Sequence, residues 1–411
     1  MEKCLFITSQ FPYPLDNGGK IGAVNGIKII KKFFDVTVLS FSEEPEYVDE
    51  GISFLSTELE NVVFEPPVNH AIHIRKNPCK LMKAMLAGYI KCMPYIVSKY
   101  QKNEMYSLID KAFNTEIFWD LIFIDYLNME PYGDYITKNY LNRFKYIVLK
   151  DHNIEYEIIK QASENSSFIK KAVLELEWRR TRRYEINAIK KYKCVFSVCD
   201  SNCNFMSKYN SKSYTMLPAY NSNSKSYEIC NEHNILYMGN LSWDANMTGL
   251  EWFVKDVFPI IRCQVPDAKL TIVGSGPASN PFKGIDGITY LGYVKDIDKV
   301  YENEAVFIVP LFEGSGIRIK ILDAFNNMIP VVSTTIGCGT ISANNGEEIL
   351  IADRSKEFAE RVVELLIDHK KNEMIARNAK DFLNREFSEE AIQCKFAKDL
   401  IEAFPDCNIE D

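Results

Sequence analysis

The stretch Val306–Ser333 combines two strand patterns and one helix pattern in a short segment. It opens with the apolar run Val306–Pro310 and closes with a second apolar run, Pro330–Ser333. Unbroken runs of this kind are typical of parallel strands buried on both faces. Apolar residues recur at helical spacing between the two runs. The order of strand, loop, helix and strand predicts one unit of an α/β fold with a parallel sheet.

The loop between this strand and this helix has a composition suited to binding an anion. Residues 313–316, EGSG, follow the carboxyl end of the strand, where open α/β sheets bind ligands. Glycines let backbone N–H groups approach an anion, and a helix N-terminus adds partial positive charge. Arg318, Lys320 and Asp323 follow at once. Two cations suit a diphosphate and a carboxylate suits ribose hydroxyls, so the stretch predicts a nucleotide-diphosphate site.

The length and charge of the chain bound its domain count and its partners. With 411 residues the chain exceeds what one core usually serves, so we expect two domains of roughly 200 residues each. The net charge of −8 argues against a dedicated nucleic-acid binder. Residues 70–215 hold 24 Lys/Arg against 15 Asp/Glu, a local charge of +9 that leaves −17 for the remainder. This asymmetry fits either an anionic partner or a solvated basic helix face.

Cysteine usage and hydropathy indicate the compartment. The eleven cysteines form no CxxC pair and no Cys/His cluster with zinc spacing, so free thiols in a reducing cytosol are expected, without a metal site. The N-terminal MEKCLFITS enters a strand pattern directly, without the apolar segment of a signal peptide. No run approaches the ~20 apolar residues of a membrane span. The sequence predicts a cytoplasmic protein, at most peripheral to a membrane.

The first half begins with a strand pattern and a glycine-rich turn. Cys4–Thr8 is apolar, Pro12 and Pro14 keep the connection out of helix, and Gly18-Gly19 opens an amphipathic helix. The turn lacks the GxGxxG fingerprint of dinucleotide-binding folds. It therefore indicates either a loop that faces a phosphate or substrate, or a plain helix start.

Further patterns fill the first half. Strands are predicted at 35–41, 61–64, 120–126, 146–150, 195–198 and 214–217, with helices in 77–114, 155–193 and 201–209. Lysines beside an apolar stripe in 77–114 suit either an anionic lipid surface or an ordinary surface helix. His152 directly follows a predicted strand, where α/β enzymes collect catalytic groups. A lone histidine there is also typical of a helix start or a core.

The polar segment 218–234 has no apolar periodicity and is the best interdomain linker in the chain. After it the alternation of strands and helices restarts. Strands are predicted at 235–238, 269–273 and 288–291, a loop at 239–247, and helices at 249–262, 356–367, 371–384 and 389–403. We expect two Rossmann-like α/β halves, 1–217 and 235–388, followed by a crossover helix in 389–411.

Several motifs resemble the GT-B glycosyltransferases of family 4, also called group 1. In the second half they are ILYMGNLSWDANMTGLEWFVKDVFPII, DAKLTIVGSGP, LGYVKDI and VPLFEGSGIRIKILDAFNNMIPVVST, in the family's order; in the first half they are FPYPLDNGGKIGA and LKDHNIEYE. The resemblance implies a GT-B architecture: two Rossmann-like α/β/α domains face across a cleft, and the C-terminal helices pack back on the N-terminal domain.

The resemblance also implies a function. The implied reaction is a retaining, metal-independent transfer of a hexose-type sugar from a UDP- or GDP-type nucleotide diphosphate sugar. This donor is a substrate, and no further cofactor is implied. The donor would bind the C-terminal domain, and a glycan or lipid-linked acceptor would lie against the N-terminal domain. The implied setting is bacterial surface polysaccharide biosynthesis at the inner face of the plasma membrane, with peripheral association and no nucleic acid.

The family's functional residues carry over to matching positions. Arg318 and Lys320 would hold the diphosphate and stabilise the leaving group. Glu313 would lie beside the donor sugar, His152 would reach that sugar from the N-terminal domain, and Asp323 would bind the ribose. The remaining donor-binding residues implied are the loop glycines Gly18 and Gly19, the cleft-facing Gly239 and Trp243, Gly274 and Gly276, the base-binding turn Gly292, Tyr293 and Val294, and the amide-bearing Gly314, Ser315 and Gly316.

Two departures from the family pattern keep alternatives open. Nine residues separate Glu313 from Asp323, whereas seven separate the family's two glutamates, and Asp is one methylene shorter than Glu. These departures support a pseudoenzyme that binds nucleotide-sugar or scaffolds a biosynthetic complex. An epimerase or a phosphorylase on the same architecture is a further alternative, whereas the lack of GxGxxG disfavours a dehydrogenase.

Overall fold

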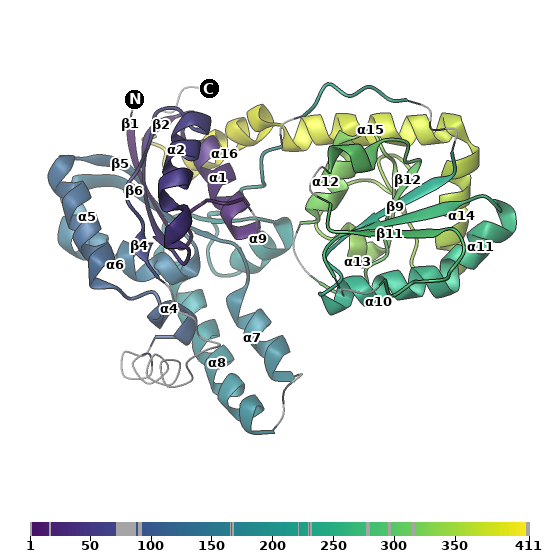
Figure 1. Cartoon of the computed structure of the whole chain (residues 1–411). Coiled ribbons are helices and arrows are strands. Elements are labelled where there is room, and N and C mark those ends of the chain that lie inside the picture. Colours follow the sequence, from purple (N-terminus) through teal and green to yellow (C-terminus); the bar gives the residue numbers. More distant parts are fainter. Residues whose placement is uncertain are drawn as a thin grey trace. The chain divides into compact units, whose positions relative to one another are not determined.

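The chain forms two compact α/β units, Met1–Ala219 together with Ile392–Asp411, and Tyr220–Ala391. Each unit is built on its own sheet of parallel strands (Figure 1). The α/β class predicted from the sequence is therefore confirmed. The computed structural model describes residues 2–15, 18–70, 88, 93–164, 166, 168–220, 222–228, 230, 232–276, 280–294, 297–314 and 317–407.

The first unit has an eight-stranded sheet with the order β3-β2-β1-β5-β6-β7-β8, and β4 pairs with β2. The chain runs outward from β1 to β3 and then resumes on the other side of β1 with β5. The strand order therefore reverses between β1 and β5, which is where open α/β sheets bind ligands. The strands are β1 (Glu2–Thr8), β2 (Phe34–Ser42), β3 (Val62–Phe64), β4 (Val68–Asn69), β5 (Trp119–Asp125), β6 (Phe144–Asp151), β7 (Val195–Ser197) and β8 (Ser213–Thr215).

Apolar side chains of β1 alternate between the two faces of this sheet. Cys4 and Phe6 join one apolar cluster, and Leu5 and Ile7 join another. Burial on both faces is the reason why the strand reads as an unbroken apolar run. The described helices of the unit are α1 (Gly18–Ile30), α2 (Val48–Glu58), α4 (Tyr95–Ser98), α5 (Asn103–Thr115), α6 (Glu130–Tyr140), α7 (Glu155–Glu164), α8 (Phe168–Lys191), α9 (Asp200–Met206) and α16 (Glu389–Ala403).

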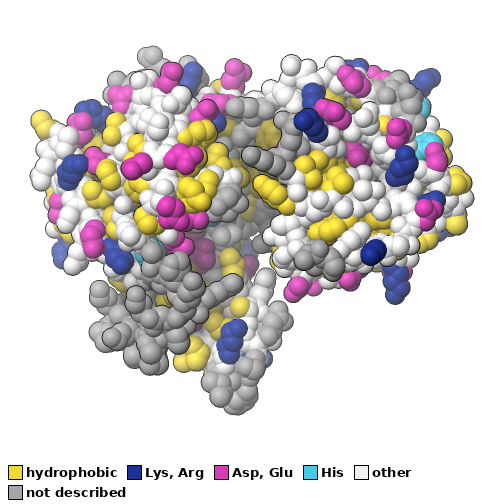
Figure 2. Space-filling view, viewed as in Figure 1, with side chains coloured by type: hydrophobic (Ala, Val, Ile, Leu, Met, Phe, Trp, Pro, Cys, Tyr) yellow, Lys and Arg dark blue, Asp and Glu magenta, His cyan; other side chains and the backbone are white. Residues whose placement is uncertain are grey.

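The predicted helical tract 155–193 is a pair of helices, α7 and α8, which extends away from the sheet of the first unit (Figure 1). Two of its arginines are paired: Arg179 with Glu175, and Arg180 with Glu177. Of the lysine-rich segment predicted in 77–114, residues 77–87 and 89–92 lie outside the described residues. Figure 2 shows acidic and basic side chains interspersed over the described part of the drawn face.

The second unit has a six-stranded sheet with the order β11-β10-β9-β12-β13-β14. The strand order reverses between β9 and β12. The strands are β9 (Asn234–Met238), β10 (Lys269–Val273), β11 (Ile288–Gly292), β12 (Val306–Val309), β13 (Val331–Ser333) and β14 (Leu350–Ile351). The described helices are α10 (Asp244–Trp252), α11 (Phe258–Gln264), α12 (Ile319–Asn326), α13 (Thr335–Cys338), α14 (Ser355–Ile367) and α15 (His369–Phe387).

The loop after β9 is shorter than predicted. Helix α10 begins at Asp244, inside the predicted loop 239–247. An acidic residue in the first turn suits a helix N-terminus, and burial of Ala245 and Leu250 anchors the helix from that turn onward. A π-helical segment, Phe253–Val257, then joins α10 to α11, so the predicted single helix 249–262 is interrupted.

The C-terminal helices divide between the units. Helix α15 belongs to the second unit, where the ring of Phe382 meets Phe325 edge-on. Helix α16 buries Ile392, Phe396 and Leu400 in the apolar core of the first unit. Helix α16 therefore returns the C-terminal end of the chain to the first unit.

Three of the expected features concern absences. Each described cysteine carries a free thiol. Within the described residues, no helix has the length and apolarity needed to cross a membrane. The same part of the chain contains no group of three or more His, Cys, Asp and Glu side chains arranged to hold a metal ion.

Candidate functional site

Two cations, Arg318 and Lys320, lie at the start of α12 on the carboxyl edge of the second sheet. Arg318 is the residue before the helix, and Lys320 belongs to its first turn. The preceding strand, β12, pairs with β9 at the point where the strand order reverses. The fold therefore places two positive charges at the edge where α/β sheets bind ligands.

The ammonium of Lys320 is held by groups from β9, its following loop and α10. Its Nζ donates to Asn246 Oδ1 at 3.4 Å and lies 5.2 Å from the centre of the Tyr237 ring. A Cβ at Gly239 would come within 2.9 Å of Nζ, so glycine permits this approach. Burial and, second, the charge of Arg318 lower the pKa of Lys320 to about 7. Because Asn246 is neutral, the described residues leave this charge without a carboxylate partner.

Arg318 lies against the turn that follows β12. Its side chain is buried, and burial lowers its pKa. A Cβ at Gly314 would come within 2.9 Å of both Arg318 Nη2 and the ring of Trp243. Gly314 has a φ of 108°, a conformation that side-chain-bearing residues rarely adopt. The turn is therefore packed between a guanidinium and an indole, and its glycine is required on two grounds.

The loops that follow β9, β10 and β11 are joined by backbone hydrogen bonds. The N–H of Gly239 donates to Val273 O at 2.9 Å, and the N–H of Gly274 donates to Gly292 O at 2.8 Å. Gly274 has a φ of 141°, and a Cβ there would lie 1.9 Å from Gly239 O. The glycines of these loops serve close backbone packing, so the carboxyl edge forms one continuous surface.

An open hollow of about 500 Å³ lies at the ends of β10 and β11, on the same edge. Three predicted residues, Gly276, Gly292 and Tyr293, line it together. Tyr293 is 77% exposed. A Cβ at Gly292 would meet nothing within 4 Å, so the turn is open on that side. Val294 follows the hollow and is half-buried.

The two predicted carboxylates have different surroundings. Glu313 is exposed. Asp323 is half-buried on α12, its Oδ1 accepts a hydrogen bond from the Tyr220 hydroxyl, and burial raises its pKa to about 7. Asp323 is therefore engaged by a side chain of its own unit. Ser315 and Gly316 lie outside the described residues.

In the first unit, His152 belongs to a buried polar network. Its Nε2 lies 2.8 Å from Asp125 Oδ1. Thr8 Oγ1 donates to Asp125 Oδ2 at 2.9 Å, and Lys150 Nζ lies 3.4 Å from Asp125 Oδ1. Thr8, Asp125 and Lys150 lie at the carboxyl ends of β1, β5 and β6. The network therefore occupies the edge where the first sheet reverses its strand order.

The charges in this network are well defined. Burial by itself raises the pKa of Asp125, but Lys150, His152 and Thr8 together lower it to about 2. Burial, together with the charge of Lys150, lowers the pKa of His152 despite the opposing effect of Asp125. The imidazole is therefore neutral, and we assign the proton to Nε2, because an ionised carboxylate only accepts hydrogen bonds. Nδ1 is left as an acceptor.

Tyr126 has an unusual backbone and contacts two predicted residues. Its φ of 82° and ψ of 144° are rare for a bulky residue, and strain of this kind, ~1–3 kcal/mol, concentrates at functional sites. Its ring stacks on His152 with a centroid separation of 3.8 Å. A Cβ at Gly19 would lie 2.7 Å from its hydroxyl oxygen and 2.8 Å from the Gln10 amide. A Cβ at Gly18 would meet nothing, so only Gly19 is required for close approach.

The predicted residues thus fall into separate groups. Gly239, Trp243, Gly314, Arg318 and Lys320 come together at the β9–β12 edge. Gly276, Gly292 and Tyr293 share the hollow, and Gly18, Gly19 and His152 belong to the first unit. Sequence reasoning missed Asn246 and Asp125. A carboxylate near the end of the apolar run 120–126 is a signal for Asp125, whereas nothing distinguishes Asn246 among the polar residues of the predicted loop 239–247.

Solved structures with the same fold identify the architecture of the chain. HepE from Anabaena, crystallised in complex with UDP, has a TM-score of 0.64 with 13% identity, over 97% of this chain and 100% of HepE. Sucrose-phosphate synthase from Thermosynechococcus elongatus has a TM-score of 0.62 with 14% identity, over 99% of this chain and 100% of that enzyme. The chain therefore has the GT-B architecture.

Comparison of sequences identifies the second unit more closely. Residues 232–368 match the family model described as Glycosyl transferases group 1. This part of the chain is therefore similar to the glycosyl transferases group 1 family. A full-length relative, an uncharacterized 44.6 kDa protein in the cps region of Klebsiella pneumoniae, is 23% identical over 408 residues, which cover 95% of this chain and 98% of the relative.

Proposed function

We propose that the protein is a retaining glycosyltransferase that moves a sugar from a nucleoside diphosphate sugar to a glycan or lipid-linked acceptor. The proposal includes metal-independent chemistry and a role in bacterial surface polysaccharide assembly. The similarity of residues 232–368 to the glycosyl transferases group 1 family supports the reaction class. The cps-region relative supports the setting, and the UDP in the HepE structure supports a UDP-type donor.

The observation that carries this proposal is the pair of cations at the β9–β12 edge. Burial lowers the pKa of Arg318 and of Lys320, which means that the folded protein carries both charges at an energetic cost. The described partner of the Lys320 ammonium is the neutral amide of Asn246. A diphosphate would supply negative charge beside the Lys320 ammonium, and binding it would offset the cost of burying that charge.

The dimensions of the second unit fit the rest of such a donor. The hollow at β10 and β11 lies one to two strand spacings, roughly 5–10 Å, from β9. A nucleoside diphosphate with its phosphates at Arg318 and Lys320 would extend along this edge and put its base beside Tyr293. In this placement, Glu313 and the turn at Gly314 would face the donor sugar.

The proposed chemistry assigns a role to each cation. As the bond between the anomeric carbon and the diphosphate oxygen breaks, negative charge develops on that oxygen. Arg318 and Lys320 would stabilise this charge, which lowers the barrier because they are already in place. A hydroxyl of the acceptor forms the new glycosidic bond on the same face of the sugar, and its proton passes to the departing diphosphate.

A melting-temperature screen tests the donor site. The full chain would be heated with UDP, GDP, ADP, dTDP and their sugars, since a bound ligand stabilises the folded state by mass action. We expect one base to raise the melting temperature and the double variant Arg318→Ala/Lys320→Ala to lose that shift. Lys356→Ala, which removes an exposed lysine on α14 of the same unit, serves as the control.

Transfer itself is then measured with the matching nucleotide-sugar and candidate acceptors, with the anomeric configuration of the product read by NMR. We expect the wild-type product to retain the anomeric configuration of the donor, and we expect the double variant to lose turnover. Unchanged turnover in that variant contradicts the site. Conversion of the nucleotide-sugar without acceptor indicates an epimerase, and binding without any product indicates a scaffold.

A further inference from the structure

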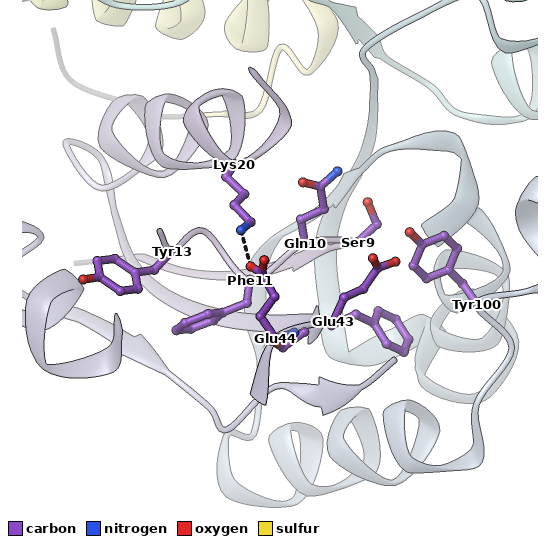
Figure 3. Close-up of a pocket in the computed structure, with 10 residues that line it drawn as sticks. Ser9, Gln10, Phe11, Tyr13, Lys20, Glu43, Glu44 and Tyr100 are labelled. Carbon is purple, nitrogen blue, oxygen red and sulfur yellow. Dashed lines mark hydrogen bonds and ion pairs between the residues drawn. The ribbon is translucent and has the colours of Figure 1, made fainter. Parts of the chain in front are cut away.

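A cavity of about 250 Å³ lies in the first unit, on the carboxyl edge of its sheet. It begins at Ser9, one residue after β1 ends, and its walls include Gln10, Lys20 of α1, and Glu43 and Glu44, which follow β2. Figure 3 shows the polar ends of these side chains gathered in one space, with Lys20 reaching down from its helix. None of the residues assigned to the donor or to the His152 network lines it.

Part of the cavity wall is made of buried side chains. Ser9 is 4% exposed and Lys20 is 8% exposed, so both are built into the wall. The ring of Tyr100, which closes one side, stacks on His70 at 4.2 Å and meets Phe41 edge-on at 5.4 Å. Buried wall residues of this kind lose little conformational freedom when a ligand binds, whereas Glu43 is exposed and accessible to a ligand.

Carboxylates dominate the face that a ligand would meet. Among the described residues that line the cavity, Lys20 is the one cation, and it is matched by Glu44, with Nζ 2.6 Å from Oε2. Glu43 brings a second carboxylate beside Tyr100 (Figure 3). Lys99 lies near Tyr100, with Nζ 4.9 Å from the centre of its ring; burial lowers the pKa of Lys99, and the charge of Glu43 opposes that shift. The cavity therefore offers hydrogen-bond acceptors to donors such as hydroxyl groups and repels an anion.

The size of the cavity narrows the ligand further. A volume of about 250 Å³ corresponds to roughly eight water molecules at ~30 Å³ each and is below the range of drug-sized sites. One six-membered sugar ring with its hydroxyls is a ligand of this size. Vicinal hydroxyls of a sugar can donate to the two oxygens of one carboxylate, and the apolar face of the ring suits an aromatic wall.

We propose that this cavity binds one uncharged pyranose ring of the acceptor through hydroxyl groups that donate to Glu43 and Glu44. The inference rests on the proposed function and adds the chemical class of the acceptor. It runs against the anionic acceptor suggested by the charge of residues 70–215, because the groups that face the ligand here are acidic.

Ligand-observed NMR titration of the full chain tests the inference. The probes are neutral methyl pyranosides of glucose, galactose, mannose, rhamnose and N-acetylglucosamine, and the anionic methyl glucuronide. We expect at least one neutral pyranoside to bind at least tenfold more tightly than the glucuronide. Glu43→Gln should weaken the neutral ligand about tenfold, because hydrogen bonds to a charged acceptor are the stronger ones, and should narrow the gap to the glucuronide.

Glu60→Gln is the matched control, because it removes an exposed carboxylate of the same unit that does not line the cavity. It should change neither affinity. Absence of binding by every neutral pyranoside, equal affinity in Glu43→Gln, or preference for the glucuronide overturns the inference. These outcomes leave nucleotide-sugar binding by the second unit unchanged, whereas failure of the proposed function appears as loss of that binding.

Discussion

Replacing Lys320 by methionine should make the free protein more stable. The side chain is half-buried at the end of β9, and its pKa falls from 10.5 to about 7, mainly through burial. At 1.36 kcal/mol per pKa unit, the charged form costs roughly 4 kcal/mol at pH 7. Part of the side chain remains in water, which screens the charge, so we expect about 2 kcal/mol of stabilisation from Lys320→Met, or ~4–8 °C in melting temperature.

The sign of the pH dependence follows from the direction of the shift. A lysine whose folded pKa lies below its unfolded pKa destabilises the fold fully below pH 7. The penalty shrinks as pH rises from 7 and vanishes above 10.5, where both states are neutral. The difference in melting temperature between Lys320→Met and wild type should therefore be largest at pH 6–7 and small by pH 10.

Differential scanning calorimetry of both proteins across this pH range measures the effect. Lys356→Met, which removes an exposed lysine from the same unit, should differ little from wild type at any pH. A Lys320→Met variant that is less stable than wild type, with a difference that does not change with pH, would refute the reasoning. The ammonium would then be compensated in the free protein, and the case for an anion at this edge would lose its main support.

Three further outcomes follow from the same geometry. Affinity for UDP-glucose, measured by calorimetric titration, should fall up to tenfold per pH unit above pH 7, because Lys320 of the ligand-free protein loses its proton there. The diphosphate of UDP-glucose has no group that titrates near neutrality, so Lys320→Met should show no such fall. Gly314→Ala should weaken this affinity at least tenfold through its contacts with Arg318 and Trp243, whereas Gly346→Ala, at a φ of 90° in open space, controls for strain alone. Urea titration should show Gly19→Ala destabilising by ~1–3 kcal/mol and Gly18→Ala remaining within ~0.5 kcal/mol of wild type.

The strands and the cation pair were predictable because their signals are local. A strand that is buried on both faces needs apolar side chains at every position, so a run such as Val306–Pro310 directly indicates a buried strand. Arg318 and Lys320 could be assigned because they follow a strand end and a glycine-rich turn within one short segment. In this arrangement, sequence proximity and spatial proximity coincide.

The remaining features depend on contacts between distant segments. Nothing in the sequence around Asp323 indicates that Tyr220 would donate to it, because that contact joins residues more than 100 positions apart. Gly18 and Gly19 are adjacent and equivalent in sequence, and only the fold shows that Tyr126 approaches one of them. The start of α10 at Asp244 was missed because burial of its first turn depends on the rest of the unit.

The carboxyl edges of the two sheets carry different charges. Each sheet reverses its strand order at one point, β9–β12 in the second unit and β1–β5 in the first. The second unit places two cations at that point, and burial lowers the pKa of both, which favours an anionic ligand. In the first unit, Asp125 at that point is matched by Lys150, and Glu43 and Glu44 line the cavity on the same edge, which favours a ligand that donates hydrogen bonds. Such a division of charge would keep a charged donor and a neutral acceptor from competing for each other's sites.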